Sequence, residues 1–227
     1  KEEIKEIIDN VDIEIETFIH GAMCAGYSGR CVMSNFLTNR DANRGGCSQI
    51  CRWDFDLLNE NKEEIKGDMP FTFCSKDLSM LKYIPDMIDL GITSFKIEGR
   101  MKSPEYVAGV TSIYRKYIDL YLVNKEKFKI EEKDINHLKN LYTRGSMETG
   151  YYKRHNGREM VTLSKGSYEN SVSDYTNEIK TRYVEQDKKL PVCGRANFRI
   201  GEPGSLEIWL LGDNGEQKNT VRVLTSV

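Results

Sequence analysis

Residues 92–123, ITSFKIEGRMKSPEYVAGVTSIYRKYIDLYLV, set the structural class of this chain. The first six of them, 92–97, are rich in β-branched and aromatic residues, which predicts a short strand. Ser103-Pro104-Glu105 then supplies a helix N-cap with proline at the first helical position. The longest helix of the chain should therefore run on to Val123. A strand followed closely by a long helix is the unit from which α/β proteins with parallel sheets are built.

The segments before this unit repeat the same alternation of strand and helix. The predicted elements are a helix over 2–10, strands over 11–18 and 70–73, and a helix over 76–90 that Pro85 bends or splits. Between the first two strands, the stretch from His20 to about Asp54 is too long for an ordinary connection. We therefore expect that stretch to be functional.

The last third of the chain changes character. After a further helix over 126–141, short β-like runs follow at 160–164, 181–184, 190–198, 206–211 and 220–224. We expect three parts: an α/β part over 1–125 that carries the cysteine-rich loop, a helical connector over 126–150, and a small all-β domain over 151–227, a β-barrel that is incomplete.

Composition excludes several classes of protein. The 227 residues carry a net charge of −2 and are 39% hydrophobic, so they can bury a core but have no global attraction to nucleic acid or anionic membrane. No apolar run reaches the length of a membrane span, and no export signal opens the chain. The expected location is therefore the cytoplasm, where the six cysteines would stay reduced.

Four cysteines fall within one glycine-rich, basic segment. They are Cys24, Cys31, Cys47 and Cys51, separated by six, fifteen and three residues. Structural zinc sites usually use closer pairs of ligands, whereas iron–sulfur clusters accept wider spacings on loops. Spacing therefore favours an iron–sulfur cluster, with zinc and unligated thiols as alternatives. Cys74 is a possible fifth thiol at the same place, and Cys193 is more typical of a small core residue.

Several polar side chains end or follow predicted strands and should gather beside the cysteines. His20 follows one strand, and Lys96, Glu98 and Arg100 lie at the end of another. A structural histidine and an internal salt bridge are the simpler interpretations of these residues. The segment that holds the four cysteines also carries Arg40, Arg44 and Arg52, which are candidates for phosphate contacts.

Protease motifs are tested directly by inspection. The chain has no Gly-x-Ser-x-Gly elbow and no His-Glu-x-x-His zinc motif. A Cys24–His20 nucleophile pair stays open as an alternative, although a single nucleophile rarely comes with three further cysteines nearby.

These residues together resemble a known family. The run ETFIHGAMC (16–24), the run SGRCVMS (28–34) and the later runs NRGGC (43–47), SKDL (75–78) and KIEGRMKS (96–103) are similar to the motifs of the peptidase U32 family, which was named for collagenase-like proteolysis. The resemblance covers most of residues 12–160. It implies the C-terminal portion of a TIM-like barrel, which would need its missing N-terminal half or a second subunit to cover its sheet edges.

Within that family, the chain is most similar to members associated with RNA hydroxylation. The resemblance implies a [4Fe–4S] cluster held by Cys24, Cys31, Cys47 and Cys51, with prephenate as co-substrate and the wobble uridine of tRNA as target. His20, Lys96, Glu98 and Arg100 would then be catalytic, and Cys74 becomes a less likely ligand. A collagenase-like peptidase and a non-catalytic, RNA-binding iron–sulfur scaffold are the alternatives.

Overall fold

The computed structural model describes residues 1–27, 29–65, 71–100, 102–143, 146–153, 157–163, 174–186, 192–199, 203–211 and 217–224. The chain divides into two compact units, residues 1–184 and 185–227. The expected division at residues 125 and 150 stays a prediction. Each unit is described by itself.

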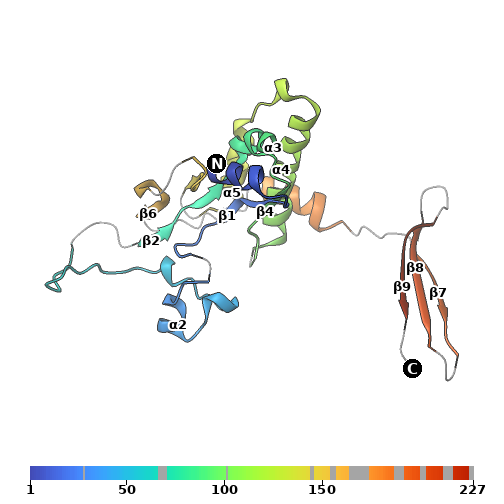
Figure 1. Cartoon of the computed structure of the whole chain (residues 1–227), viewed down its shortest axis with the longest axis horizontal. Helices are drawn as coiled ribbons and strands as arrows, with labels where there is room; N and C mark the ends of the chain where they lie inside the picture. Colours follow the sequence, from blue (N-terminus) through green and yellow to red (C-terminus); the bar gives the residue numbers. More distant parts are fainter. Residues whose placement is uncertain are drawn as a thin grey trace. The chain divides into compact units, whose positions relative to one another are not determined.

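A mixed four-stranded sheet lies at the centre of the first unit (Figure 1). Its strands, in spatial order, are β4 (Ser94–Ile97), β1 (Glu16–Ala22), β3 (Asp77–Ser79) and β5 (Met147–Glu148). β1 runs parallel to β4, and β3 runs parallel to β5, but β1 and β3 are antiparallel. The α/β class is confirmed, whereas the expectation of an all-parallel sheet is wrong at the β1–β3 pair. The described residues form no closed barrel, and a TIM-barrel portion is not confirmed.

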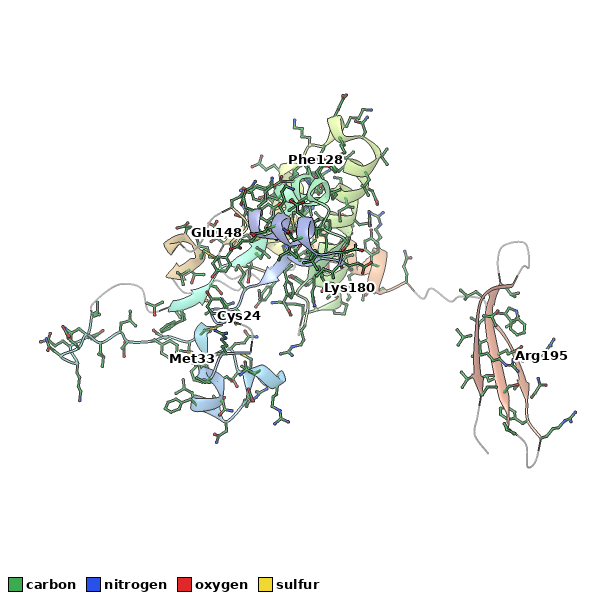
Figure 2. The ribbon with its side chains drawn as sticks, in the orientation of Figure 1. Cys24, Met33, Phe128, Glu148, Lys180 and Arg195 are labelled. Atoms are coloured by element: carbon green, nitrogen blue, oxygen red, sulfur yellow. The ribbon has the colours of Figure 1, made fainter. Side chains whose placement is uncertain are left out.

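Helices of the first unit pack against the sheet, and the side chains between them form its core (Figure 2). They are α1 (Glu2–Asn10), α3 (Ile84–Leu90), α4 (Pro104–Val123) and α5 (Glu132–Leu141). α4 begins where the sequence predicts, with the Ser103 side chain accepting from the amide of Tyr106. Its buried face includes Val110 and Tyr117, which pack in one cluster with Ile19 of β1. Among the helices in the described ranges, none has the length and apolarity needed to cross a bilayer.

The predicted helix over 76–90 is wrong in its first half. Residues 77–79 form β3 and pair with β1, so that Ser79 lies opposite His20. A 3₁₀ turn, η3 (Leu81–Tyr83), then leads into α3, which has Pro85 in its first turn. Proline fits there because the first amides of a helix have no intrahelical partner. The proline therefore marks a helix start and not a bend.

Two other boundaries differ from the sequence prediction. β1 starts at Glu16 and not at residue 11, because Val11 and Ile13 are exposed and the buried run of the strand is 19–21. The predicted strand at 181–184 is also wrong. Those residues form the π-helical turn η6 (Lys180–Val184), which continues α6 (Asp174–Ile179) against α4. Residue 164, the end of the predicted run at 160–164, lies outside the described residues.

The long connection after β1 forms a compact loop with short helical turns. We call residues 23–55 the cysteine loop; it contains α2 (Met33–Thr38), η1 (Ala42–Arg44) and η2 (Ile50–Arg52). It leads to a two-stranded sheet of β2 (Phe71–Ser75) and β6 (Val161–Leu163). The remaining short turns are η4 (Lys125–Lys127) and η5 (Arg158–Met160).

The second unit is a three-stranded antiparallel sheet. Its strands are β7 (Val192–Asn197), β8 (Ser205–Leu211) and β9 (Gln217–Leu224), in that order. The expected all-β character is confirmed for these strands. They are not closed into a barrel within the described part of the chain.

Candidate cysteine-lined site

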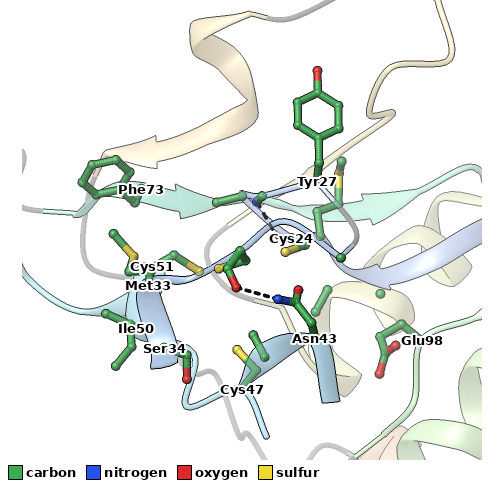
Figure 3. Close-up of a pocket in the computed structure, with 18 of the residues that line it drawn as sticks. Cys24, Tyr27, Met33, Ser34, Asn43, Cys47, Ile50, Cys51, Phe73 and Glu98 are labelled. Atoms are coloured by element: carbon green, nitrogen blue, oxygen red, sulfur yellow. Dashed lines mark hydrogen bonds between the residues drawn. The ribbon is translucent and has the colours of Figure 1, made fainter. Parts of the chain in front are cut away.

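All four cysteines of the loop line one cavity of about 760 Å³ (Figure 3). The cavity lies where β1 leaves the sheet, so His20 and Gly21 form part of its wall. Apolar side chains make up much of the rest. The lining includes Phe18, Met23, Cys24, Tyr27, Cys31, Val32, Met33, Asn43, Cys47, Ile50, Cys51, Phe73, Leu78 and Glu98. The sequence prediction that these cysteines come together at the end of a strand agrees with this arrangement.

Hydrogen bonds internal to the cysteine loop hold its shape. The Ser34 hydroxyl is buried and accepts the amide of Ser48 at 3.0 Å, while the Thr38 hydroxyl donates to the Ser34 carbonyl at 2.7 Å. The Asn43 side chain donates to the carbonyl of Cys31 at 3.1 Å. Ile50, also buried, supplies the apolar centre. These contacts tie the first half of the loop to the second, and so bring Cys31 toward Cys47 and Cys51.

The surroundings of three of the thiols act on their charge in opposite directions. The amide of Gly26 donates to the Cys24 sulfur at 3.4 Å, and the amide of Gln49 donates to the Cys47 sulfur at 3.2 Å. Burial raises the pKa of Cys51, and its proximity to Cys24 and Cys47 adds to that effect, while the neighbouring Arg52 opposes it. All six cysteines are free thiols.

The donor set consists of soft thiol ligands, which both zinc and iron–sulfur clusters accept. In the described residues, no three His, Cys, Asp or Glu side chains come close enough together to hold a metal ion. Four thiols line the cavity, and two of them accept backbone amides, as cluster-ligating sulfurs do. The iron–sulfur cluster expected from the sequence stays a prediction.

Arg52 fastens the end of the cysteine loop to the sheets. Its guanidinium donates to the Cys74 sulfur at 3.2 Å and also to the carbonyls of Ser75 and Met23. The Ser75 hydroxyl donates to the same Met23 carbonyl at 2.8 Å. Cys74 is only 4% exposed and does not line the cavity. The predicted phosphate contact of Arg52 remains untested, and the structure gives this side chain a structural role.

His20 is buried below the cavity, with 1% of its surface exposed. Its Nδ1 lies 3.2 Å from the hydroxyl of Tyr114, which itself donates to the Ile19 carbonyl at 2.8 Å. Because that hydroxyl has a single proton, Nδ1 carries the hydrogen in the His20–Tyr114 bond. Burial, assisted by the positive charge of Lys102, lowers the pKa of His20 to about 3. His20 is therefore neutral at physiological pH, with Nε2 as its acceptor.

Lys96 lies within β4, Glu98 and Arg100 follow it, and the three side chains go to different places. Glu98 lines the cavity opposite the cysteines, and its amide donates to the His20 carbonyl at 2.9 Å (Figure 3). Arg100 is exposed and donates to the Gly45 carbonyl of the cysteine loop at 3.2 Å. Lys96 does not line the cavity; it pairs with Glu16 at 3.0 Å, and its side chain is 50% exposed. Only His20 and Glu98, of the four expected catalytic residues, therefore meet at the cavity.

The predicted phosphate-binding arginines other than Arg52 lie on the outside of the loop. Arg40 follows α2, and Arg44 ends η1, directly after the cavity-lining Asn43. Both side chains are exposed. No structural observation yet tests their contact with nucleic acid.

The sequence prediction missed Tyr114 and Asn43. Tyr114 fixes the ring of His20, and Asn43 joins Cys31 to the second half of the loop. A usable signal for Tyr114 was present, because Tyr106 and Tyr114 share one face of α4. Their hydroxyls donate to the carbonyls of Glu98 and Ile19. Asn43 carried no comparable signal.

Comparisons with known proteins place the chain among relatives of two kinds. Over 135 residues it is 56% identical to the "tRNA hydroxylation protein P1" of Bacillus subtilis, covering 57% of this chain and 32% of that protein. Over 162 residues it is 41% identical to the "Uncharacterized protease MJ0090" of Methanocaldococcus jannaschii, covering 67% and 39%. Over 118 residues it is 40% identical to the "23S rRNA 5-hydroxycytidine C2501 synthase" of Escherichia coli, covering 52% and 18%.

The chain thus spans less than half the length of each of these relatives. No solved structure matches it. A family profile described as "Peptidase family U32" matches residues 1–162, which include the sheet, the cysteine loop and β6. On that match, the chain belongs to peptidase family U32.

Proposed function

We propose that the protein hydroxylates RNA with the help of a [4Fe–4S] cluster, and that its substrate is the wobble uridine of tRNA, with prephenate as co-substrate. The observation that carries the proposal is the gathering of Cys24, Cys31, Cys47 and Cys51 around one cavity. The names of two relatives, a tRNA hydroxylation protein and an rRNA 5-hydroxycytidine synthase, support RNA hydroxylation as the reaction class.

The four cysteines would hold the cluster as thiolates. When bound, the cluster supplies one-electron redox chemistry inside the cavity. The amides of Gly26 and Gln49 stabilise negative charge on Cys24 and Cys47, and burial at Cys51 keeps water away from that ligand.

Glu98 and His20 are polar groups of the cavity with different roles. The Glu98 carboxylate already accepts the amide of Arg100 at 3.0 Å, which orients it. It is the natural proton acceptor at this wall. His20 stays neutral, so its Nε2 acts only as a hydrogen-bond acceptor toward a substrate N–H or O–H.

The position of Arg100 suits a carboxylate-bearing co-substrate. Its guanidinium reaches the cysteine loop at Gly45 and is otherwise exposed, so donors remain for a bidentate contact. Lys96 is a weaker candidate, because its ammonium group is already paired with Glu16.

The test is the 5-hydroxyuridine content of cellular tRNA, measured by mass spectrometry. In a strain that lacks this protein and any redundant hydroxylase, the wild-type gene should restore the modification, whereas Cys47→Ser and Arg100→Ala should not. Cys193→Ser is the matched control, since Cys193 lies in the second unit, and it should restore fully. A strain whose tRNA is modified equally by wild type and Cys47→Ser would refute the proposal. A protein that binds a cluster and RNA but leaves tRNA without 5-hydroxyuridine would favour the alternative of a non-catalytic, RNA-binding iron–sulfur scaffold.

A peptidase is the second candidate, because one relative is named a protease. In the described residues, however, no histidine hydrogen-bonds to a cysteine sulfur, so a Cys–His nucleophile pair is absent there. The peptidase hypothesis requires gelatin cleavage by the pure protein that persists after iron is removed. The hydroxylase hypothesis requires no such cleavage.

A further inference from the structure

Two aromatic rings stand almost fully exposed on the cysteine loop. Tyr27 is 82% exposed and Phe36 is 85% exposed, although large aromatic side chains usually bury most of their surface. Val32, on the same loop, is also exposed. Exposed apolar groups gathered in this way mark a surface that binds something.

These residues continue the mouth of the cysteine-lined cavity. Tyr27 and Val32 line the cavity itself. Phe36 lies one helical turn beyond Val32, because its amide donates to the Val32 carbonyl at 2.9 Å. A ligand that enters the cavity beside Val32 therefore meets the ring of Phe36 immediately outside.

Three arginines lie on the same loop as the two rings. The amide of Arg30 donates to the Tyr27 carbonyl at 3.2 Å, so these residues share one turn. Arg40 follows the helix of Phe36, and Arg44 follows the cavity-lining Asn43. The one acidic residue between positions 20 and 53 is Asp41. Its carboxylate is already engaged with the amide of Asn43 at 2.9 Å.

We infer that Tyr27 and Phe36 form a stacking platform for unpaired nucleotides of RNA, with Arg30, Arg40 and Arg44 at the phosphates. The inference rests on the proposed function and identifies how its substrate is recognised. Exposed ring faces can bind only bases that are not already stacked in a duplex. Arginines at the rim attract the backbone without reading its sequence. A protein partner would match the apolar surface but not this surplus of positive charge.

The experiment measures binding of a fluorescent RNA hairpin with an unpaired loop, and of the same stem closed as a blunt duplex, by the full chain. Phe36→Ala and Phe36→Leu should each weaken hairpin binding about ten-fold, since a stacked base contributes that much. Phe36→Trp should bind as wild type. Duplex affinity should not change. Phe36 is exposed, so thermal melting of all three variants should match wild type and exclude misfolding.

Salt titration separates the rings from the arginines. Arg44→Gln should lower the slope of log affinity against log salt by about 0.7, the value for one phosphate of a single strand. Phe36→Ala should leave that slope unchanged. Restoration of binding by Phe36→Leu, or no effect of Phe36→Ala, would overturn the inference.

Failure of the inference and failure of the proposed function give different results. Wild-type protein that makes 5-hydroxyuridine but binds the hairpin independently of Phe36 refutes only the platform. Phe36-dependent hairpin binding by a protein that makes no 5-hydroxyuridine refutes only the reaction.

Discussion

The imidazole of His20 and the phenol of Tyr114 form one buried hydrogen-bonded pair, with Nδ1 3.2 Å from the hydroxyl oxygen. The same oxygen donates to the Ile19 carbonyl and accepts the amide of Met80 at 3.2 Å. Tyr114 thereby joins α4 to β1 and to the start of η3. The pair fixes the strand that carries the cavity wall.

His20 should make the stability of the protein depend on pH. Its native pKa is about 3, below the value of 6.5 for an unperturbed histidine, so the unfolded chain binds a proton that the native protein does not. Stability is therefore fully present above pH 6.5 and falls as pH decreases toward 3. Between pH 7 and pH 5 this loss should be about 2 kcal/mol in urea unfolding. His20→Gln should lose that pH dependence, and a variant that keeps it would contradict the assignment.

Gly21 has no room for a side chain. A Cβ there would lie 2.6 Å from the Glu98 carbonyl oxygen, and φ is +111°. Gly21→Ala should therefore destabilise the protein by about 3 kcal/mol in chemical unfolding. Gly91→Ala is the control, because it has φ of +93° but no atom within 4 Å, so it adds backbone strain alone, about 1 kcal/mol. Equal losses in the two variants would show that Gly21 and Glu98 are not in close contact.

Arg52 should behave as a structural arginine. Arg52→Lys keeps the charge but cannot donate to Cys74, Ser75 and Met23 at once, so we expect a loss of about 2 kcal/mol. The exposed Arg40→Lys should change stability by less than about 0.5 kcal/mol. Unchanged stability in Arg52→Gln, which removes the charge, with a weaker salt dependence of RNA binding, would instead support the phosphate contact expected from the sequence.

The ligand set predicts a pattern among the cysteine variants. Anaerobically prepared protein should show iron–sulfur absorption together with iron and sulfide. That absorption should largely disappear in the alanine variants of Cys24, Cys31, Cys47 and Cys51, because each lines the cavity. Cys74→Ala should keep it, since Cys74 faces Arg52 outside the cavity. Stoichiometric zinc without iron, or loss of the cluster in Cys74→Ala but not in Cys51→Ala, would contradict this ligand set.

Local signals in the sequence predicted β4 and α4. The other elements were predicted less well, because they depend on pairing between residues that are distant in the sequence. The cap at Ser103 and the proline after it are contained in the sequence itself, and both ends of α4 agree with the structure. Residues 77–79 have no local signal strong enough for a strand. They become β3 only because β1 lies beside them.

The positions of the site residues also depend on pairing between distant strands. Alternation alone would put Lys96 and Glu98 on one side of a strand. The strand ends at Ile97, however, and the pairing of β1 with β4 shifts between Phe18 and His20. Glu98 consequently reaches the cavity while Lys96 stays outside. The clustering of the cysteines was predictable because all four fall within one short segment of the sequence. The burial of His20 was not, because it depends on helices far away in the sequence.

Hydrogen bonds join Ser34, Thr38 and Ser48 to one another, and Asn43 to Cys31, through groups of the cysteine loop alone. If the proposed cluster is bound, these bonds would already hold the loop before the cluster arrives. The cluster would then be inserted into a loop that is already folded. Zinc fingers differ, because they fold only when their ion binds. Without a cluster, such a site would be sensitive to air, because neighbouring thiolates can oxidise to a disulfide. A disulfide between any two of the four cysteines would prevent iron from binding until a reductant broke the disulfide.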